Sequence, residues 1–311
     1  MTCWRGLEEI PADWSGCAVT IGVFDGVHRG HQHVVKRAVA RAGDVGVPTV
    51  AVTFAPRPVE LFAPDKAPPL LTTVSTRVHL LGELGVDAVL VLPFTRELSQ
   101  LSPDDFVRTV LIERLGARAV VVGDAFRFGH RAAGDVALLR KLGEGSGFAV
   151  EGVAPVSGGG TEPYSSSRAR DCVASGDVAA ASKILGRPHR VEGTVQRGDG
   201  RGREIGYPTA NLDYPPDLAI PADGVYAGWL RHPPDQRQPA AISIGTNPTF
   251  SGQSRTVEAY ALDRGDLELY GAHVTVDFVE RLRETLRFDS VAGLVDEMGR
   301  DVERTREVLA G

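Results

Sequence analysis

Two histidines, His28 and His31, are separated by Arg-Gly and offer the first chemistry in this chain. They follow an apolar run, residues 17–24, that is typical of a buried strand in a parallel sheet, and residues 29–43 beyond them are polar and helix-compatible. The unpaired N–H groups and positive dipole at the start of a helix attract a phosphate. Two imidazoles one short turn apart add donors, and Gly30 lets the phosphate approach the backbone. The pattern predicts a phosphate-binding turn; a pair of solvated surface histidines is the alternative.

A glycine- and arginine-rich stretch, residues 191–212, is the second candidate site. Its glycines permit a backbone that wraps a polyphosphate, although the GxxxxGK[ST] pattern of a Walker A loop is absent. A flexible, turn-rich loop would account for the glycines alone. It would not account for Thr209 and Asn211, which share one face if the segment is a strand and which carry the hard oxygen ligands that Mg²⁺ prefers. The stretch contains Gly193, Gly198, Gly200, Gly202 and Gly206, with Arg197, Arg201 and Arg203 supplying positive charge.

Composition limits the class of protein in which these sites lie. A length of 311 residues favours about two domains, and 42% hydrophobic with 24% charged residues is ordinary for a soluble globular protein. The formal net charge of −6 argues against a general nucleic-acid or anionic-membrane binder, so each phosphate site must be a local positive spot. Three cysteines without metal-type spacing fit a reducing cytoplasm. We recognise no signal peptide, and no run approaches the roughly 18 apolar residues that a membrane helix needs.

The first half alternates between strand-like and helix-compatible segments. This alternation predicts βαβ units with right-handed crossovers, hence an α/β domain built on a parallel sheet. Ligands of such sheets bind beyond the carboxyl ends of the strands, and His28 and His31 follow one such end. The strand-like runs are residues 17–24, 48–54, 87–92, 119–123 and 148–153, and the helical stretches are residues 29–45, 76–84, 103–115 (with Ser102 as the expected N-cap) and 135–143.

The second half has a different pattern. Residues 171–185 are Ala-rich and helix-compatible, and Gly-Arg-Pro at residues 186–188 ends that helix, so we place a domain boundary between residues 186 and 187. Beyond it, short strand-like runs with Gly- and Pro-rich turns predict a small closed antiparallel barrel. Residues 290–309 have one apolar stripe and predict an amphipathic helix that packs on the barrel. The strand-like runs are residues 191–196, 224–230, 240–244, 257–262 and 273–279.

The string GVFDGVHRGH, residues 22–31, resembles the HxGH motif of the nucleotidyltransferase superfamily. In its full length it resembles the adenylyltransferase half of the bacterial bifunctional riboflavin kinase/FAD synthetases. Three later segments resemble the same family: TFAPRP (residues 53–58), VVGDAFRFGH (residues 121–130) and SSSRAR (residues 165–170). The resemblance implies a Rossmann-like nucleotidyltransferase domain in residues 1–186, in which His28 and His31 are catalytic. The ATP-binding residues that it implies are Gly22, Phe24, His28, Gly30, His31, Ser166, Ser167 and Arg168.

Residues 191–212 closely resemble the riboflavin kinase signature GxxxGRxxGxPTANL. SIGTNPTF (residues 243–250), followed by TVEAYAL (residues 256–262), resembles a further pattern of this kinase, and the match puts Glu258 at its catalytic base; taken alone, Glu258 would be a solvent-facing strand residue. Such a carboxylate takes the proton of an alcohol that attacks the γ-phosphorus of ATP. ERLRETLRFDS, residues 280–290, resembles the flavin-contacting stretch, although Phe288 alone would fit a core position. For the kinase domain, residues 187–311, the resemblance implies ATP binding by Gly193, Gly198, Arg203, Gly206, Pro208, Thr209 and Asn211, a Mg²⁺ site at Thr209 and Asn211, and flavin binding by Glu258, Arg283 and Phe288.

Five residues of the first half depart from the family pattern, among them Ser167 in place of Thr and Ala169 in place of Ile. Ala55 and Arg57 stand where the motif usually has Asp and His, and Ala125 stands where it has Asp or Asn. The loss of a hydrogen bond to a charged group is worth roughly 1.5–3 kcal/mol, or about tenfold to a hundredfold in affinity or rate. We therefore expect the nucleotide site of the first half to be weakened but not abolished, and Arg57 to supply a charge where the family has a histidine.

Taken together, the resemblances imply two sequential reactions. The second domain would phosphorylate riboflavin with MgATP to give FMN, and the first would join AMP to FMN, giving FAD and pyrophosphate. The implied partners are riboflavin, FMN and ATP, with Mg²⁺ as cofactor, no nucleic acid and no membrane, in a cytoplasmic monomer or weakly self-associating protein. One alternative is a riboflavin kinase whose nucleotidyltransferase half is impaired or has an altered nucleotide or flavin specificity. The other is a flavin- or RNA-binding regulator on the same scaffold.

Overall fold

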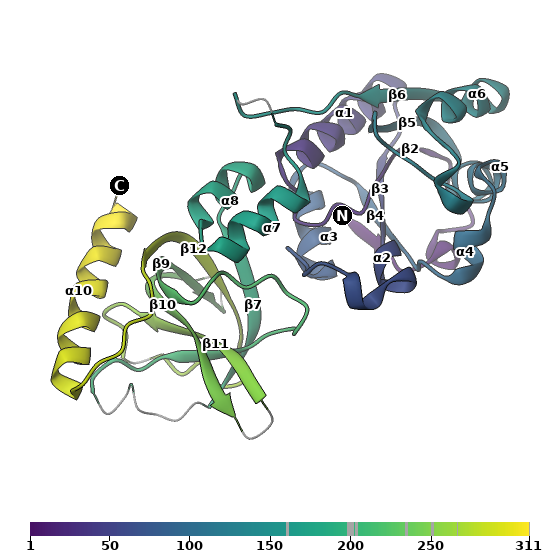
Figure 1. The fold of residues 1–311 in the computed structure, drawn as a ribbon. Helices are drawn as coiled ribbons and strands as arrows, with labels where there is room; N and C mark the ends of the chain where they lie inside the picture. The colour runs from purple at the N-terminus through teal and green to yellow at the C-terminus, as the bar shows by residue number, and fades with distance from the viewer. Residues whose placement is uncertain are drawn as a thin grey trace. The chain divides into compact units, whose positions relative to one another are not determined.

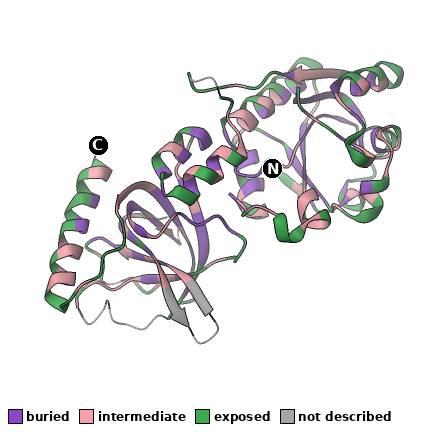
Figure 2. Ribbon diagram, in the orientation of Figure 1, coloured by how far each residue is buried: buried purple, intermediate pink, exposed green. Residues whose placement is uncertain are grey.

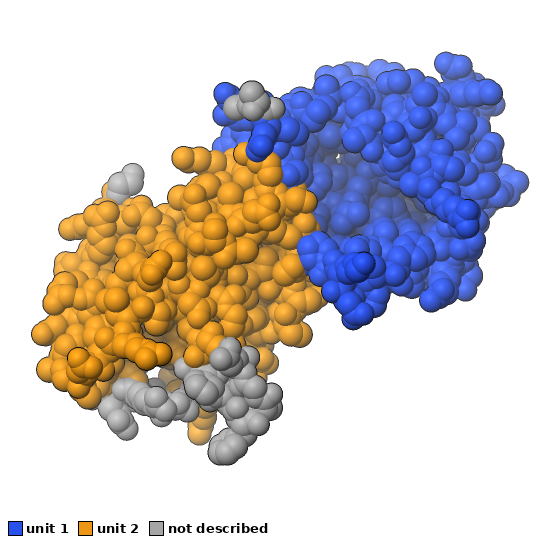
Figure 3. Space-filling view, viewed as in Figure 1, with its two compact units in different colours: residues 1–68, 73–165 blue, residues 69–72, 166–311 orange. Residues whose placement is uncertain are grey.

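The structure, a computed structural model, describes residues 1–159, 162–197, 202, 205–233, 236–249, 252–265 and 267–310. The chain divides into two compact units (Figure 3). The first unit comprises residues 1–68 and 73–165, and the second comprises residues 69–72 and 166–311. The sequence-based boundary between residues 186 and 187 lies inside the second unit, because the two helices before it, α7 (Ser166–Ser175) and α8 (Val178–Leu185), group with the barrel. As a division between two activities, that boundary stays a prediction.

The first unit is built on a six-stranded parallel sheet, which confirms the predicted α/β architecture (Figure 1). Its strand order is β1-β4-β3-β2-β5-β6. Strands β2 and β4 are buried along their whole length, as their continuous apolar runs predict (Figure 2). The hydrophobic pattern did not identify β1, which is short. The strands are β1 (Thr2–Trp4), β2 (Cys17–Ile21), β3 (Thr49–Phe54), β4 (Ala88–Leu92), β5 (Ala117–Gly123) and β6 (Ala149–Val153).

The helices of the first unit begin at the caps that their sequences provide. The hydroxyl of Ser102 accepts the N–H of Asp105, as predicted for an N-cap, and Pro103 opens α5. The expected helix over residues 103–115 then continues as a π-helical segment, η3. The elements are α1 (Arg29–Val45), α2 (Pro58–Phe62), α3 (Val74–Glu83), α4 (Arg96–Gln100), α5 (Pro103–Phe106), η3 (Val107–Arg114) and α6 (Val136–Ser146), with short 3-10 turns η1 (Leu7–Glu9), η2 (Pro64–Lys66) and η4 (His130–Ala132).

The second unit is a closed antiparallel barrel with strand order β10-β11-β8-β7-β12-β9, as predicted from the second half of the chain. The terminal helix α10 (Val291–Ala310) packs against β9, β10 and β12 (Figure 1). Val191, Tyr226 and Phe278 are among the fully buried residues of the barrel core. The strands are β7 (His189–Gln196), β8 (Ala210–Asp213), β9 (Gly224–His232), β10 (Gln236–Thr249), β11 (Gly252–Ala261) and β12 (His273–Arg283). The four-residue strand β8 was not among the predicted runs.

Residues 69–72 join the second unit although they come from the middle of the first half. Leu70 forms a parallel β-bridge with Leu218, and its N–H donates to the carbonyl of Asp217 at 2.7 Å. The carbonyl of Leu70 accepts the N–H of Ala219, also at 2.7 Å. A segment distant in sequence thus completes the barrel unit. Within the described part of the chain, no helix is long and apolar enough to cross a membrane.

A buried carboxylate joins three strands of the barrel. Asp277 on β12 is 4% exposed; it accepts from Arg190 of β7 at 2.6 and 2.9 Å and from Arg231 of β9 at 2.9 Å. Burial raises the pKa of Asp277, but the hydrogen bonds and charges of the two arginines outweigh burial and lower it below its ordinary value. A carboxyl group whose pKa is lower in the folded than in the unfolded state stabilises the fold above the unfolded-state pKa, and this stabilisation is lost as pH falls through the folded-state pKa.

We therefore expect Asp277→Asn to lower the free energy of unfolding at pH 7 by about 1.5–3 kcal/mol. The difference between the wild type and the variant should shrink in the acid range, where the wild-type carboxylate is also protonated. Urea unfolding of the full chain at several pH values measures both effects. Glu307→Gln, which removes an exposed ion pair with Arg304, is the matched control and should change stability by less than about 0.5 kcal/mol. A difference that stays constant from neutral to acid pH would contradict the role of the ionised carboxylate.

Candidate active sites

The predicted phosphate-binding turn lies between β2 and α1. His28 is the N-cap of α1, and its Nδ1 accepts the backbone N–H groups of Gly30 at 3.1 Å and His31 at 3.3 Å. Because Nδ1 is an acceptor, the neutral imidazole of His28 carries its proton on Nε2 as a hydrogen-bond donor. The ring of His31 stacks on that of His28, with centroids 3.6 Å apart and planes inclined by 23°. The two imidazoles therefore lie together at the start of a helix.

The backbone leading into this turn is left-handed at three positions. The φ angles are 51° at Phe24, 80° at Gly26 and 41° at Val27. A side chain at Gly30 would lie 2.9 Å from the His28 ring, so the glycine makes room for the capping imidazole. A side chain at Gly22 would lie 3.0 Å from the ring of Phe24. In this structure both glycines are therefore explained by packing against neighbouring rings.

A cavity of about 640 Å³ lies in the same unit, and sequence reasoning did not identify it. Gly22 and Val23, which follow β2, form part of its wall. Phe126 and Phe128 stack with ring centroids 5.6 Å apart, and both line the cavity. Both belong to the VVGDAFRFGH segment, so the two phenylalanines of that motif are the sequence feature that could have indicated the cavity. A large, mostly apolar cavity with a few polar groups suits a flat aromatic ligand. The aromatic residues of its wall are Phe54, Phe62, Phe94, Phe106, Phe126 and Phe128.

The other predicted residues of the first half divide between the two units. Ser166, Ser167 and Arg168 open α7, which belongs to the second unit, and their assignment to ATP stays a prediction. Ala125 is exposed on the turn that follows β5. Arg57 is 4% exposed and pairs with Asp25 and Glu60. The positive charge of Arg57 is therefore neutralised by two carboxylates of the protein, and these ion pairs account for the arginine at this position without a bound ligand.

The catalytic candidates of the second half lie together in the barrel. Glu258 of β11 is paired in register with Asn211 of β8. The hydroxyl of Thr209, just before β8, donates to Oε2 of Glu258 at 3.2 Å, and Nδ2 of Asn211 donates to Oγ1 of Thr209 at 3.5 Å. The antiparallel pairing thus brings Thr209 and Asn211 to Glu258, which is 49 residues after Thr209 in sequence.

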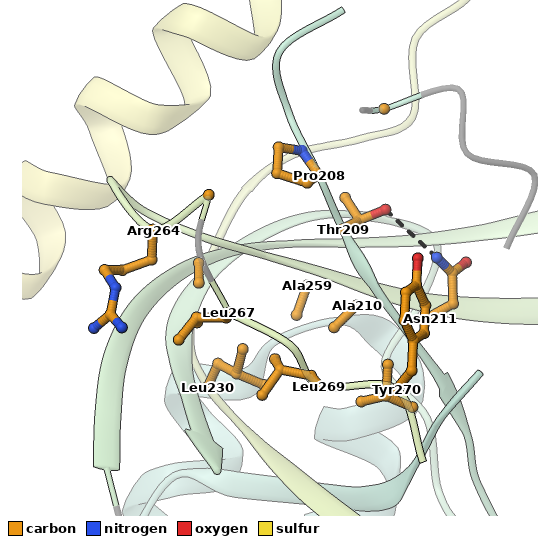
Figure 4. Close-up of a pocket in the computed structure, with 14 residues that line it drawn as sticks. Pro208, Thr209, Ala210, Asn211, Leu230, Ala259, Arg264, Leu267, Leu269 and Tyr270 are labelled. Carbon is orange, nitrogen blue, oxygen red and sulfur yellow. Dashed lines mark hydrogen bonds between the residues drawn. The ribbon is translucent and has the colours of Figure 1, made fainter. Parts of the chain in front are cut away.

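Two cavities meet at Thr209. The smaller, about 110 Å³, is lined by Thr209, Asn211 and Pro208; Figure 4 shows Thr209 and Asn211 on one side of it and leucines on the other. The larger, about 330 Å³, is lined by Glu258 and again by Thr209. Thr209 is thus in the wall of both cavities, and it donates to Glu258 of the larger one. The larger cavity is also lined by Tyr207, Arg283, Phe288, Leu294 and Met298.

The oxygen donors at this junction fit Mg²⁺. Because Asn211 donates from Nδ2, its Oδ1 can act as a ligand beside the hydroxyl of Thr209, and both are hard oxygens of the kind that Mg²⁺ prefers. Among the described residues, no group of three or more His, Cys, Asp or Glu side chains could hold a metal ion. The candidate metal site therefore consists of a hydroxyl and an amide oxygen, to which bound phosphates can add ligands.

The remaining kinase candidates are Arg283, Gly193, Gly206, Gly198 and Arg203. Arg283 lines the larger cavity, but its Nε and one terminal nitrogen donate to Asp301 of α10 at 2.9 and 2.6 Å, so this arginine also attaches α10 to β12. A side chain at Gly193 would lie 2.3 Å from the carbonyl of Asp213, so close packing of β7 on β8 explains this glycine. Gly206 has a φ of 89°, which favours glycine. Gly198 and Arg203 lie outside the described residues.

Comparison with known proteins assigns each half of the chain. Residues 10–168 match the family model of FAD synthetase, and residues 185–309 match that of riboflavin kinase. A bifunctional riboflavin kinase/FMN adenylyltransferase from Escherichia coli is 36% identical over 97% of this chain and 96% of its own length. The protein of the same name from Pseudomonas fluorescens is 38% identical over 98% and 97%.

A solved structure has the same overall fold. The crystal structure of a chain named a macrolide-efflux protein, from Streptococcus pneumoniae, has a TM-score of 0.87 and 32% sequence identity over 98% of both chains. The two family matches together span nearly all of the chain, and the curated relatives match over almost their whole length. The chain therefore belongs to the family of bifunctional riboflavin kinase/FMN adenylyltransferases.

Proposed function

We propose that this chain makes both flavin cofactors from riboflavin and ATP. In the first reaction, the 5′-hydroxyl of riboflavin attacks the γ-phosphorus of ATP, and FMN forms as ADP leaves. In the second, a phosphate oxygen of FMN attacks the α-phosphorus of a second ATP, and FAD forms as pyrophosphate leaves. The proposal rests on family membership over almost the whole length and on the site geometry of each half.

One observation carries the kinase assignment: Thr209 borders two cavities and donates to Glu258, which lines the larger of them. We assign ATP to the smaller cavity, with its phosphates beside Thr209 and Asn211, and riboflavin to the larger. The proton of the attacking hydroxyl passes to the Glu258 carboxylate, which acts as general base. Thr209 and Asn211 are the residues that would hold Mg²⁺, whose charge stabilises the transferring phosphoryl group.

The assignment of the larger cavity to riboflavin is supported by its walls. The side chains of Tyr207, Phe288 and Met298 provide apolar and aromatic surface for a flavin ring, and Glu258 is among the polar groups. Arg283 holds α10 through Asp301, so we assign it the role of forming the cavity as well as contacting the flavin. We propose that Gly193, Gly206 and Pro208 position the backbone around ATP. Gly198 and Arg203, which lie outside the described residues, stay predicted ATP-binding residues, with Arg203 supplying positive charge.

For the adenylyltransferase half, we assign the ATP phosphates to the turn at His28 and His31. The FMN phosphate is already a competent nucleophile at neutral pH, so catalysis there requires positioning and stabilisation of charge rather than a general base. The Nε2–H of His28 and the ring of His31 at the start of α1 can provide this. ATP binding by Ser166, Ser167 and Arg168, which belong to the second unit, is proposed on the family resemblance alone. The phenylalanine-lined cavity beside Gly22 suits the isoalloxazine ring of FMN.

The partners in this proposal are small molecules: riboflavin, FMN, ATP and Mg²⁺. We place the enzyme in the cytoplasm as a monomer or weakly self-associating protein, and the division between its activities near residues 186–187. A kinase with an impaired adenylyltransferase is the second candidate, because Ala55 and Ala125 lack the polar groups of the family motif. A non-enzymatic regulator is disfavoured by the Thr209–Glu258 arrangement, which a binding protein does not need.

Product analysis separates these possibilities. Incubation of the protein with riboflavin, MgATP and pyrophosphatase should yield FMN first and then FAD, resolved by chromatography. FMN without FAD, even at high enzyme concentration and with FMN supplied directly, would support the kinase-only alternative. Riboflavin bound but not phosphorylated would support the regulator.

Replacement of the proposed base tests the kinase mechanism. We expect Glu258→Ala to lower the rate of FMN formation by about 10²–10⁴-fold while riboflavin binding, measured by flavin fluorescence, is retained. Glu307→Gln on α10 is the control, because it removes an exposed carboxylate that pairs with Arg304 and does not line the cavity. An unchanged rate in Glu258→Ala would exclude Glu258 as the base.

Restoring the polar groups tests the departures in the first half. We expect Ala125→Asn, alone or with Ala55→Asp, to raise kcat/KM for FAD formation by about tenfold to a hundredfold, since one hydrogen bond to a charged group is worth roughly 1.5–3 kcal/mol. The measurement is the initial rate of FAD formation from FMN. Ala40→Asn, on the exposed part of α1, should leave this rate unchanged. If neither restored residue increases the rate, these positions do not limit the activity.

A further inference from the structure

A buried carboxylate that the proposed mechanism does not use lies just before the phosphate-binding turn. Asp25 is 1% exposed, and its Oδ2 lies 3.5 Å from a terminal nitrogen of Arg57. Its Oδ1 lies 3.9 Å from a terminal nitrogen of Arg77. Both arginines are themselves buried, at 4% and 1% exposure. Three charges in the interior of one small unit are costly unless they are paired, so the ion pairs of this cluster offset the free energy of its desolvation. We therefore ask what these pairs hold in place.

The two arginines connect Asp25 to three other elements. Arg57 donates from Nε to Glu60 of α2 at 2.7 Å and from a terminal nitrogen to the carbonyl of Pro68 at 2.7 Å. Arg77 of α3 donates to Oγ1 of Thr53, at the end of β3, at 3.2 Å. Arg57 and Arg77 are thus among the charged groups that face Asp25, and Glu60 pairs with Arg57. Burial lowers the pKa of Arg77, and the negative charge of Asp25 opposes that shift.

A further hydrogen bond attaches the network to the turn itself. The hydroxyl of Thr53 donates to the carbonyl of Val23 at 2.9 Å, while it accepts from Arg77. The turn is therefore held at two residues on either side of Phe24, through the backbone of Val23 and through the side chain of Asp25. Both contacts come from groups on elements far away in sequence, so neither can form unless β3, α2 and α3 are in place.

The turn needs such support because its backbone is strained. Phe24 and Val27, on either side of Asp25-Gly26, have φ angles of 51° and 41°, and each non-glycine residue in the left-handed region costs roughly 1–3 kcal/mol. For the β-branched Val27 this conformation is a rare outlier. The residue that follows Val27 is His28, whose Nδ1 caps α1. The conformation of the turn therefore determines where the imidazoles of His28 and His31 lie.

We propose that Asp25 is a positioning residue for the ATP-binding turn, held by Arg57 and Arg77. The inference rests on the proposed assignment of His28 and His31 to the phosphates of ATP. The ion pairs keep Phe24, Gly26 and Val27 in the left-handed region. The two imidazoles are therefore in place before ATP binds.

The experiment uses the full chain and measures FAD formation against ATP and FMN concentration in Arg57→Met, Arg57→Lys, Asp25→Asn and His28→Ala. We expect Arg57→Met and Asp25→Asn to raise the KM for ATP at least tenfold and to lower kcat/KM by up to about 10²-fold, because the imidazoles move. The KM for FMN should stay within about twofold, because the phenylalanine-lined cavity is intact. Arg57→Lys keeps the charge and should recover most of the loss.

Two controls come with the chain. Riboflavin kinase activity of the same preparations should be unchanged, since that site belongs to the second unit. Arg37→Met removes the half-exposed ion pair between Arg37 of α1 and Glu151 of β6, at 2.7 Å, and should leave both KM values unchanged. It matches Arg57→Met in chemistry and in unit but does not touch the turn.

Distinct results overturn the positioning role. A lower kcat with both KM values unchanged would mean a smaller folded fraction, and thermal unfolding of the first unit would then show the same loss. If His28→Ala raises the KM for ATP but Arg57→Met and Asp25→Asn do not, the network does not position the turn. If His28→Ala itself leaves the KM for ATP unchanged, the assignment of the turn to ATP fails, and the positioning role fails with it. Should Arg57→Met not fold, Asp25→Asn decides the outcome.

Discussion

The kinase site depends on one backbone register, the antiparallel pairing of the short strand β8 with β11. This pairing sets Asn211 opposite Glu258 and Ala210 opposite Ala259. Because side chains alternate along a strand, a shift by a single residue would turn Glu258, the proposed base, away from Thr209. The closed barrel enforces the register, since every strand is paired on both sides and none can slide alone.

The two candidate sites are assembled in different ways. The turn at His28 is largely local: the histidine caps the helix that follows it, and His31 stacks on it one turn later. The proposed kinase site is almost entirely non-local, because Thr209, just before β8, and Glu258 of β11 are 49 residues apart in sequence. A local site can be read from a short motif. A non-local site needs the whole barrel to be closed before any of its chemistry is possible.

Several arginines in the described part of the chain contribute to internal structure. Arg190 and Arg231 neutralise Asp277 within the barrel, Arg283 attaches α10 through Asp301, and Arg57 pairs with Asp25 and Glu60. A planar guanidinium can donate to two carboxylate oxygens at once, which makes it a suitable connector between elements. In an acidic protein, an arginine within a motif is therefore not by itself a phosphate ligand, and Arg57 is the clearest example.

The sequence by itself determined the architecture of both units and the principal catalytic candidates. Periodic apolar runs predict the parallel strands, Ser102 predicts a helix start, and the Thr-x-Asn spacing predicts that Thr209 and Asn211 share a face, because each depends on neighbours only a few residues away. Family motifs, not periodicity, singled out Glu258.

Only the tertiary structure decided which distant groups meet. No local pattern pairs Leu70 with Leu218, gathers six phenylalanines around one cavity, or shows that Arg57 is buried beside Asp25. Each of these depends on contacts between segments that are separated by many residues, so the free energy that selects them arises only when the chain has folded.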